Sequence, residues 1–399
     1  MNIPSTTACR FASALSTAPR FERAVEEVCG PVAHRLGGPP DLAVLFVSAD
    51  RAMLCDRLAE CICRQLGTER LVGCTGEAIV GVTREVEEGP ALSLWAARLP
   101  DTTVLPMHLT FERTADGPTI LGWPDELLEG WPTDAALLVL GEPFSFPAEL
   151  LLEQINEQHP GSPLFGGMAS GGPLPGVNRL LLGSQVLAHG AVVVLLHGAV
   201  QVRTVVSQGC RPIGPPYVIT KAERNTIFEL GGRPALARLQ EVFRTLPTHE
   251  QEMVQRAVHV GRVVSEYQER FEPGDFLVRN VVGADPESGA IVIGDYVRIG
   301  QTVKFHIRDW QTADADLRQL LAGLKATPGV NPGGALLFTC NGRGTRLFPG
   351  PHHDAGAVAA ALGDIPLAGF FAQGELGPVA GKNFVHGFTA SLAELDGKP

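Results

Sequence analysis

The sequence predicts a mixed α/β protein with two related domains, in which strand–helix–strand repeats form twisted mixed sheets covered by helices. The main observation is a pattern that occurs three times: an apolar strand, a helix-like stretch, and a second apolar run that ends in a glycine-rich turn. The copies span residues 42–81, 135–172 and 335–378. A supersecondary unit that recurs in this way indicates a chain built from related parts.

The first copy contains the clearest helix signals. A strand over residues 42–47 leads to Asp50, a predicted N-cap. Leu58 and Ile62 then fall on one face of a helix, and Gly67 ends it. This order predicts a buried strand with a helix packed against it.

The second and third copies follow the same order. Ser145 is the predicted N-cap of the second helix, with Pro147 in its first turn and Pro160 at its end. The third helix is expected between Asp354 and Gly363.

Residues outside the repeats favour antiparallel sheet and divide the chain. Short strands cut at glycines are predicted over 179–209, a hairpin over 276–296 and an alternating strand over 302–309. A Pro- and Gly-rich stretch at 209–217 marks a domain boundary. We therefore expect an N-terminal lead-in with one helix from Pro19 to Val28, followed by two domains; the three segments are residues 1–40, 41–210 and 217–392.

Composition restricts the partners and the compartment. The net charge of −11 argues against nucleic acid or an anionic membrane as the main partner, since both require basic surfaces. The longest apolar run, residues 191–200, is too short for a spanning helix. The N-terminus lacks a continuous apolar signal segment, and the eight cysteines contain no CxxC pair. A reduced cytoplasmic protein without membrane insertion is the simplest prediction.

The glycine turns predict a ligand pocket, because backbone without side chains can approach a ligand closely at the ends of buried strands. Arg343 could pair with a carboxylate or phosphate, Asn341 could supply amide contacts, and two carboxylates in equivalent turns could bind an amine. The candidate ligand-binding residues are Gly76, Glu77, Cys340, Asn341, Arg343, Gly344, Gly374, Glu375, Asn383 and His386.

Each candidate also has a structural explanation. Arg343 could be a solvated side chain in a tight turn, Cys340 a buried thiol, and His386 a histidine that only supports its strand. No cofactor or metal is predicted: the adjacent histidines of residues 351–354 lack clear further ligands, and residues 166–172 lack the spacing of a dinucleotide-binding loop.

Several segments together resemble the FIST family, named for F-box and intracellular signal transduction proteins. The segments GCTGEAIVG (73–81) and PLFGGMASGG (163–172) resemble its N-terminal domain. Four further segments resemble its C-terminal domain: residues 219–236, CNGRG (340–344), PLAGFFAQGELGP (366–378) and NFVHGFTASL (383–392).

The resemblance implies a sensory module that binds a small molecule such as an amino acid or a related metabolite. The sequence shows little room for an output domain, so we expect signalling through a separate protein partner. Two alternatives stay open: an enzyme in which Cys340 acts as nucleophile with His386 and Glu375, and a scaffold that binds only proteins.

Overall fold

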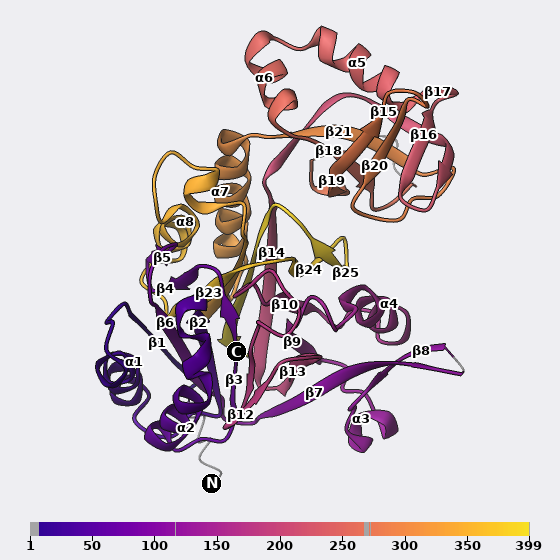
Figure 1. Ribbon diagram of the computed structural model, residues 1–399. Helices are drawn as coiled ribbons and strands as arrows, with labels where there is room; N and C mark the ends of the chain where they lie inside the picture. Colours follow the sequence, from indigo (N-terminus) through magenta and orange to yellow (C-terminus); the bar gives the residue numbers. More distant parts are fainter. Residues whose placement is uncertain (1–7, 116, 267–270, 272, 399) are drawn as a thin grey trace. The chain divides into compact units, whose positions relative to one another are not determined.

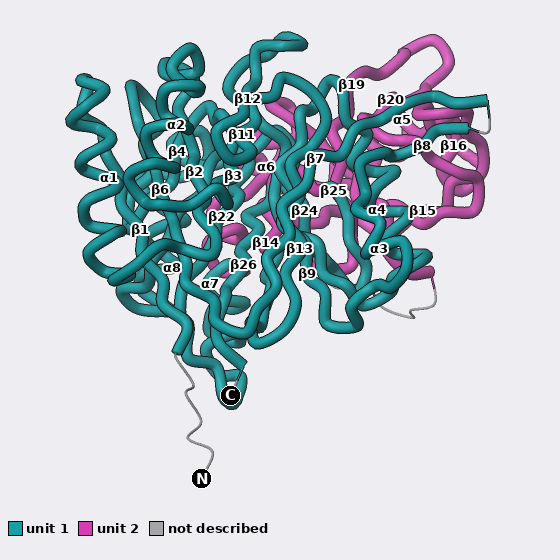
Figure 2. The backbone as a smooth tube through the Cα atoms, turned by 90° about the horizontal axis from the view of Figure 1, so that it is seen from below, with its two compact units in different colours: residues 1–206, 317–385, 389–399 teal, residues 207–316, 386–388 magenta. Residues whose placement is uncertain are grey.

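The computed structural model describes all residues except 1–7, 116, 267–270, 272 and 399. The described chain divides into two compact units (Figure 2). The first, here called the repeat unit, comprises residues 1–206, 317–385 and 389–399. The second, here called the barrel unit, comprises residues 207–316 and 386–388. The predicted division into residues 41–210 and 217–392 stays a prediction.

Three mixed sheets make up the repeat unit (Figure 1). The first has the strand order β1 (Arg10–Ser16), β6 (Leu92–Arg98), β2 (Leu42–Ser48), β3 (Leu71–Gly76), β11 (Leu180–Leu182) and β12 (Gln185–Leu187). The second has the order β25 (Lys382–His386), β24 (Glu375–Val379), β10 (Leu164–Met168), β9 (Ala136–Gly141), β13 (Ala191–Gly198), β7 (Thr102–Thr114) and β8 (Gly117–Leu121). The third has the order β14 (Val200–Gln208), β26 (Thr389–Gly397), β22 (Gly334–Cys340), β23 (Leu367–Ala372), β4 (Ile79–Gly81) and β5 (Arg84–Val86).

Each predicted repeat forms one parallel strand pair at the centre of its sheet, which confirms the predicted mixed α/β architecture. The pairs are β2 with β3, β9 with β10, and β22 with β23. Their connecting helices are α2 (Cys55–Leu66), α4 (Ala148–Gln158) and α8 (His353–Leu362). These strands are almost entirely buried, as expected for parallel strands between a helix layer and a core.

The three repeats exchange the strand that follows each glycine turn. Strand β4, which follows the first turn, pairs with β23 of the third repeat. Strand β11 follows the second turn and pairs with β3 of the first repeat, while β24 follows the third turn and pairs with β10 of the second repeat. This exchange links the three sheets in a cycle, so none of the repeats is complete by itself.

Helices cover the outer faces of the sheets, and a shared apolar core fills the inside. Helices α1 (Phe21–Leu36) and α2 pack on the first sheet, α3 (Asp125–Glu129) and α4 on the second, and α8 with the second half of α7 (Trp310–Ala326) on the third. In the core, the ring of Phe46 stacks on Phe370 with centroids 5.2 Å apart, and Phe338 packs edge-on against both. Aromatic rings thus join the first and third repeats.

The barrel unit is antiparallel and contains none of the repeats. Its strands run in the order β15 (Cys210–Glu223), β21 (Thr302–Arg308), β18 (Val258–Val263), β19 (Phe276–Asp285), β20 (Ala290–Ile293), β16 (Thr226–Leu230) and β17 (Arg233–Pro234). An additional pairing of β15 with β16 closes the sheet. Helices α5 (Ala235–Thr245) and α6 (Thr248–Arg256) pack on it. The predicted hairpin over 276–296 is confirmed by β19 and β20.

Several local predictions need correction. Residues 1–40 contain strand β1 besides a helix, and that helix extends to Leu36. Asp50 is not the cap of a regular helix, because residues 49–54 form a 3-10 turn (η1, Ala49–Leu54) before α2. Ser145 does not cap α4 either, since its hydroxyl donates to the Glu142 carboxylate at 2.7 Å. Two further 3-10 turns are η2 (Pro273–Asp275) and η3 (Gly344–Arg346).

Candidate functional site

The three glycine turns meet at one place in the repeat unit, here called the turn junction and defined as residues 75–78, 168–171 and 371–374. Backbone hydrogen bonds connect every pair of turns: Ser170 N donates to Thr75 O at 3.1 Å, Phe371 N to Ala78 O at 2.9 Å, and Gln373 N to Met168 O at 3.0 Å. The convergence follows from the strand exchange, because each turn must lead its chain into the next sheet.

One side chain bridges all three turns. The Ser170 hydroxyl, from the second turn, accepts a hydrogen bond from Glu77 N of the first turn at 2.9 Å. The same hydroxyl donates to Phe371 O of the third turn. Ser170 is 6% exposed, so these bonds are protected from water. No separate signal in the sequence predicted a role for this residue.

The glycines of the repeats pack directly against the protein. Gly73, Gly166 and Gly369 occupy the same position in the three repeats, opposite Leu45, Val139 and Leu337 of the parallel partner strands. A Cβ atom at these glycines would lie 2.0, 1.9 and 1.8 Å from the carbonyl oxygens of those partners. Their first role is therefore to let two strands approach closely.

The three glycines in the predicted site are also close to neighbouring atoms. A Cβ at Gly76 would lie 2.9 Å from Phe370 Cβ, and one at Gly344 would lie 2.7 Å from the Glu87 carboxylate. Gly374 has more space, with Met168 at 3.4 Å, and its φ of +142° is in a region that favours glycine. A role of these residues in ligand binding stays a prediction.

Cys340 and Asn341 lie at the end of β22, beside the third turn. Asn341 N donates to Ala372 O at 3.1 Å, and the Cys340 sulfur accepts a weak hydrogen bond from Gly342 N at 3.5 Å. The buried Oδ1 of Asn341 has no hydrogen-bond partner among the described residues. A buried acceptor of this kind favours binding of a donor group.

A charged pair borders the junction. Arg346 of η3 pairs with Glu77 of the first turn and donates to Asn341 O at 2.8 Å. The two charged side chains are 58% and 39% exposed, so both are accessible to solvent. The hydrogen bond to Glu77 raises the pKa of Arg346 further above its usual value. This pair presents a cation and an anion next to each other at the carboxyl ends of the parallel strands.

Arg343, in contrast, is enclosed by the protein. It is fully buried and forms a bidentate ion pair with Asp354 of α8, at 2.7 and 2.8 Å. The guanidinium also lies over the Phe348 ring, 5.1 Å from its centroid. Burial opposes ionisation of Asp354, but the charge and hydrogen bonds of Arg343 outweigh it and hold the pKa of that carboxyl below its usual range. Arg343 thus has a structural partner in the protein itself.

A second carboxyl lies in the same buried network. Glu85 of β5 accepts a hydrogen bond from Ala355 N at 2.9 Å, and its Oε2 has no partner among the described residues. Burial, and then the negative charge of Asp354, raise the pKa of Glu85 to about 7. Its backbone N donates to His352 Nδ1 at 3.0 Å, so one histidine of the 351–354 segment has a structural role.

The remaining predicted residues, Glu375, Asn383 and His386, are not among those that define the turn junction, although Glu375 directly follows Gly374. Glu375 is buried in β24 and accepts hydrogen bonds from Thr389 N at 3.0 Å and Thr389 Oγ1 at 2.8 Å. Asn383 of β25 accepts from Leu164 N at 2.8 Å and donates to Ser162 O at 3.0 Å, which ties β25 to the second repeat. His386 is assigned to the barrel unit, whereas Cys340 belongs to the repeat unit. A catalytic role for Cys340 with His386 and Glu375 stays a prediction.

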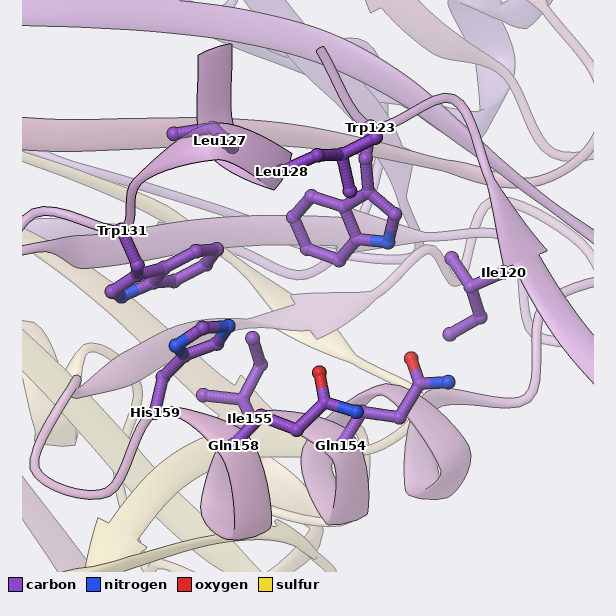
Figure 3. A pocket seen from close by; sticks show the side chains of 9 residues that line it. All are labelled: Ile120, Trp123, Leu127, Leu128, Trp131, Gln154, Ile155, Gln158 and His159. Carbon is purple, nitrogen blue, oxygen red and sulfur yellow. The ribbon is translucent and has the colours of Figure 1, made fainter. Parts of the chain in front are cut away.

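A pocket that the sequence analysis did not predict lies elsewhere in the repeat unit. It has a volume of about 200 Å³ and is lined by Ile120, Trp123, Leu127, Leu128, Trp131, Gln154, Ile155, Gln158 and His159 (Figure 3). The available signal was a repeated tripeptide: Gly-Trp-Pro occurs at 122–124 and again at 130–132. Two tryptophans in short loops around the five-residue helix α3 indicate exposed aromatic surface.

Within the described part of the chain, no three His, Cys, Asp or Glu side chains are grouped so that they could hold a metal ion. No helix among the described residues has both the length and the apolar character needed to cross a membrane.

Comparison with known proteins relates the chain to uncharacterized mycobacterial proteins. It is 44% identical over 385 residues to an uncharacterized protein of Mycobacterium tuberculosis strain H37Rv, covering 96% of this chain and 99% of the relative. An uncharacterized protein of Mycobacterium bovis is 42% identical over 386 residues, covering 96% and 98%. The FIST N domain matches residues 41–233 and the FIST C domain matches residues 235–378. The chain therefore belongs to the FIST family, whose domains are associated with sensing in signal transduction.

Proposed function

We propose that this protein is a sensory module that binds an amino acid or a related zwitterionic metabolite at the turn junction and signals through a separate protein partner. The observation that carries the proposal is the exposed pair of Arg346 and Glu77 beside the junction. A guanidinium next to a carboxylate is complementary to the carboxylate and ammonium groups of an α-amino acid. Ligands commonly bind outside the carboxyl ends of parallel strands, where this pair lies.

The neighbouring groups support the same ligand class. The unpaired Oδ1 of Asn341 is an acceptor that suits an ammonium donor. Because Arg346 and Glu77 are accessible, their mutual ion pair contributes less than about 1 kcal/mol, and a ligand can replace it at little cost.

The junction also offers a route for a signal. Its turns are joined by hydrogen bonds, and each turn leads into a strand of a different sheet. A ligand that contacts Glu77 acts on the same residue whose backbone N is bonded to Ser170. Binding there would change the relative stability of conformations of the three repeats, which a partner could recognise.

We also place the protein in the cytoplasm. The described residues contain no disulfide bond, and five of the eight cysteines are buried. This state is stable in a reducing compartment and supports the assignment.

The proposal is tested by calorimetric titration and thermal-shift screening with the standard amino acids, their keto acids and nucleotides. A bound ligand stabilises the protein in proportion to the logarithm of its concentration. We expect at least one amino acid to bind, and Arg346→Gln and Glu77→Gln to weaken that binding at least tenfold without a large change in Tm.

The matched control is Lys398→Gln. Lys398 forms an exposed ion pair with Asp134, in which both side chains are 40% exposed, and neither residue belongs to the turn junction. The Lys398→Gln variant should bind the amino acid as tightly as the wild type. An amino acid that binds the wild type and the Arg346→Gln variant equally well would contradict the proposed site.

A further inference from the structure

The pocket between α3 and α4 has two features that together indicate its ligand: aromatic walls and an acidic environment. Trp131 stacks on His159 with ring centroids 3.8 Å apart and planes 6° apart. Trp123 meets Trp131 at a steep angle, with centroids 5.9 Å apart. Two indoles and an imidazole therefore surround one small space.

The positions of these rings are fixed by the surrounding protein. The Trp131 Nε1 donates to the Ser162 hydroxyl at 3.0 Å, and this hydrogen bond fixes the orientation of the indole. Ile120, Leu127 and Ile155 belong to the buried core under the second sheet and form the floor. A site with preset walls loses little conformational entropy when a ligand binds.

The opposite side of the pocket carries neutral polar groups. Figure 3 shows the side-chain amides of Gln154 and Gln158 extending from α4 toward Trp123. Burial lowers the pKa of His159 below its usual value, which keeps the imidazole neutral at neutral pH. None of the nine lining residues is a lysine, an arginine or a carboxylate, so no charge within the lining competes with a charged ligand.

The chain segment that contributes all nine lining residues carries charge of one sign. Between Arg113 and Arg179 the sequence contains nine Asp and Glu residues and no Lys or Arg. Six of these carboxylates are exposed on the two helices that border the pocket: Asp125, Glu126 and Glu129 on α3, and Glu149, Glu153 and Glu157 on α4. Such a surface raises the local concentration of cations and repels anions.

We propose that this pocket is a second ligand site, separate from the turn junction, and that it binds a small organic cation such as a quaternary or primary ammonium compound. The faces of tryptophan rings attract cations that have lost their water, and aromatic cages are a common way to recognise quaternary ammonium groups. The volume of about 200 Å³ accommodates a headgroup of this size. An anion or a zwitterion with an exposed carboxylate would meet the acidic rim instead.

The test uses choline as the cation and 3,3-dimethylbutan-1-ol as its neutral isostere, in which carbon replaces the quaternary nitrogen. Binding is followed by isothermal titration and by quenching of tryptophan fluorescence. We expect choline to bind at least tenfold more tightly than the alcohol, and high salt to weaken the binding of choline only.

Variants locate the site. Trp131→Leu and, independently, Trp123→Leu should each weaken choline binding at least tenfold, whereas Trp310→Leu should not, because Trp310 is 40% exposed and lies outside the pocket. Tm measurements show whether each variant is folded. If Trp131→Leu does not fold, Trp123→Leu alone provides the test.

Three results would overturn the proposal. The first is equal binding of choline and the alcohol, which would make the pocket a purely apolar site. The second is choline binding that survives both tryptophan substitutions, and the third is no binding of choline, tetramethylammonium or a primary alkylamine at millimolar concentration. Arg346→Gln should leave choline binding intact, so this test is separable from that of the turn junction.

Discussion

The repeat unit and the barrel unit bury titratable groups in different ways. In the repeat unit, Arg343 and Asp354 are both buried, and each neutralises the other. In the barrel unit, His259 and His306 are buried opposite each other on β18 and β21. Burial lowers the pKa of each histidine to about 4, so both are neutral at neutral pH. The repeat unit thus fully buries a charged pair, whereas the barrel unit fully buries two neutral imidazoles.

This difference predicts opposite responses to pH. The folded pKa of both histidines lies below the unfolded value of 6.5. Their contribution to the stability of the barrel unit is therefore fully present above pH 6.5 and is lost as pH falls from 6.5 toward 4. Glu85 in the repeat unit has a folded pKa of about 7, above its unfolded value of 4.5. The protonated Glu85 therefore contributes to the stability of the repeat unit below pH 4.5, and this contribution is lost as pH rises toward 7.

The largest effect is expected for Arg343→Met. It leaves the fully buried Asp354 without its partner, which typically costs about 4 kcal/mol in the free energy of unfolding. Arg23→Met is the control, because Arg23 forms an ion pair on the surface with a side chain 72% exposed. Chemical denaturation measures both. If Arg343→Met lowers the free energy of unfolding by less than about 1 kcal/mol, the buried ion pair does not stabilise the repeat unit in the way proposed.

The next effect concerns the close approach of strands. In Gly369→Ala the new Cβ would lie 1.8 Å from Leu337 O, and the backbone must move to relieve the overlap. We expect destabilisation on the order of 3 kcal/mol. Gly356→Ala in α8 is the matched control, since its Cβ meets nothing within 4 Å and alanine favours a helix. Equal stability of the two variants would refute the role given to the repeat glycines.

These glycines show how far the sequence could predict the structure. The strand–helix–strand repeats were recognisable because buried strands and glycine turns leave local signals. The strand exchange was not, because β4, β11 and β24 pair with strands far away in sequence, and such pairing depends on the whole fold. The same reason explains Arg343: the sequence suggested a ligand-binding arginine, but Asp354 accounts for it only once α8 folds back.

The carboxyl of Glu85 gives a prediction on pH. Glu85→Gln removes the ionisation that burial opposes, so the variant should gain stability relative to wild type as pH rises from 5 to 8, by about 3 kcal/mol. Urea unfolding at four pH values, with labelling of the buried Cys74 thiol as a reporter in the repeat unit, measures the difference. An unchanged difference across this range would contradict the buried, protonated state of Glu85.

The barrel should respond in the opposite direction. Lowering the pH from 7 to 5 should destabilise it by about 2 kcal/mol for each buried histidine, and His259→Phe should remove one of these contributions. Cys210 is 1% exposed and belongs to the barrel unit, so its labelling by a disulfide reagent active at acid pH reports opening of this unit. Faster labelling of Cys74 than of Cys210 at pH 5 would contradict the expectation that acid opens the barrel unit before the repeat unit.

The turn junction, where the three repeats are held together, is tested most directly by Ser170→Ala. This substitution removes the hydroxyl that contacts both other turns and leaves the strands in place. Ser93→Ala is the control, because Ser93 is also buried and its hydroxyl has no partner among the described residues. Hydrogen–deuterium exchange should show faster exchange in Ser170→Ala at the Glu77 and Phe371 amides together, with no such change in Ser93→Ala. Faster exchange confined to the second turn, or to none of the three, would contradict a shared junction.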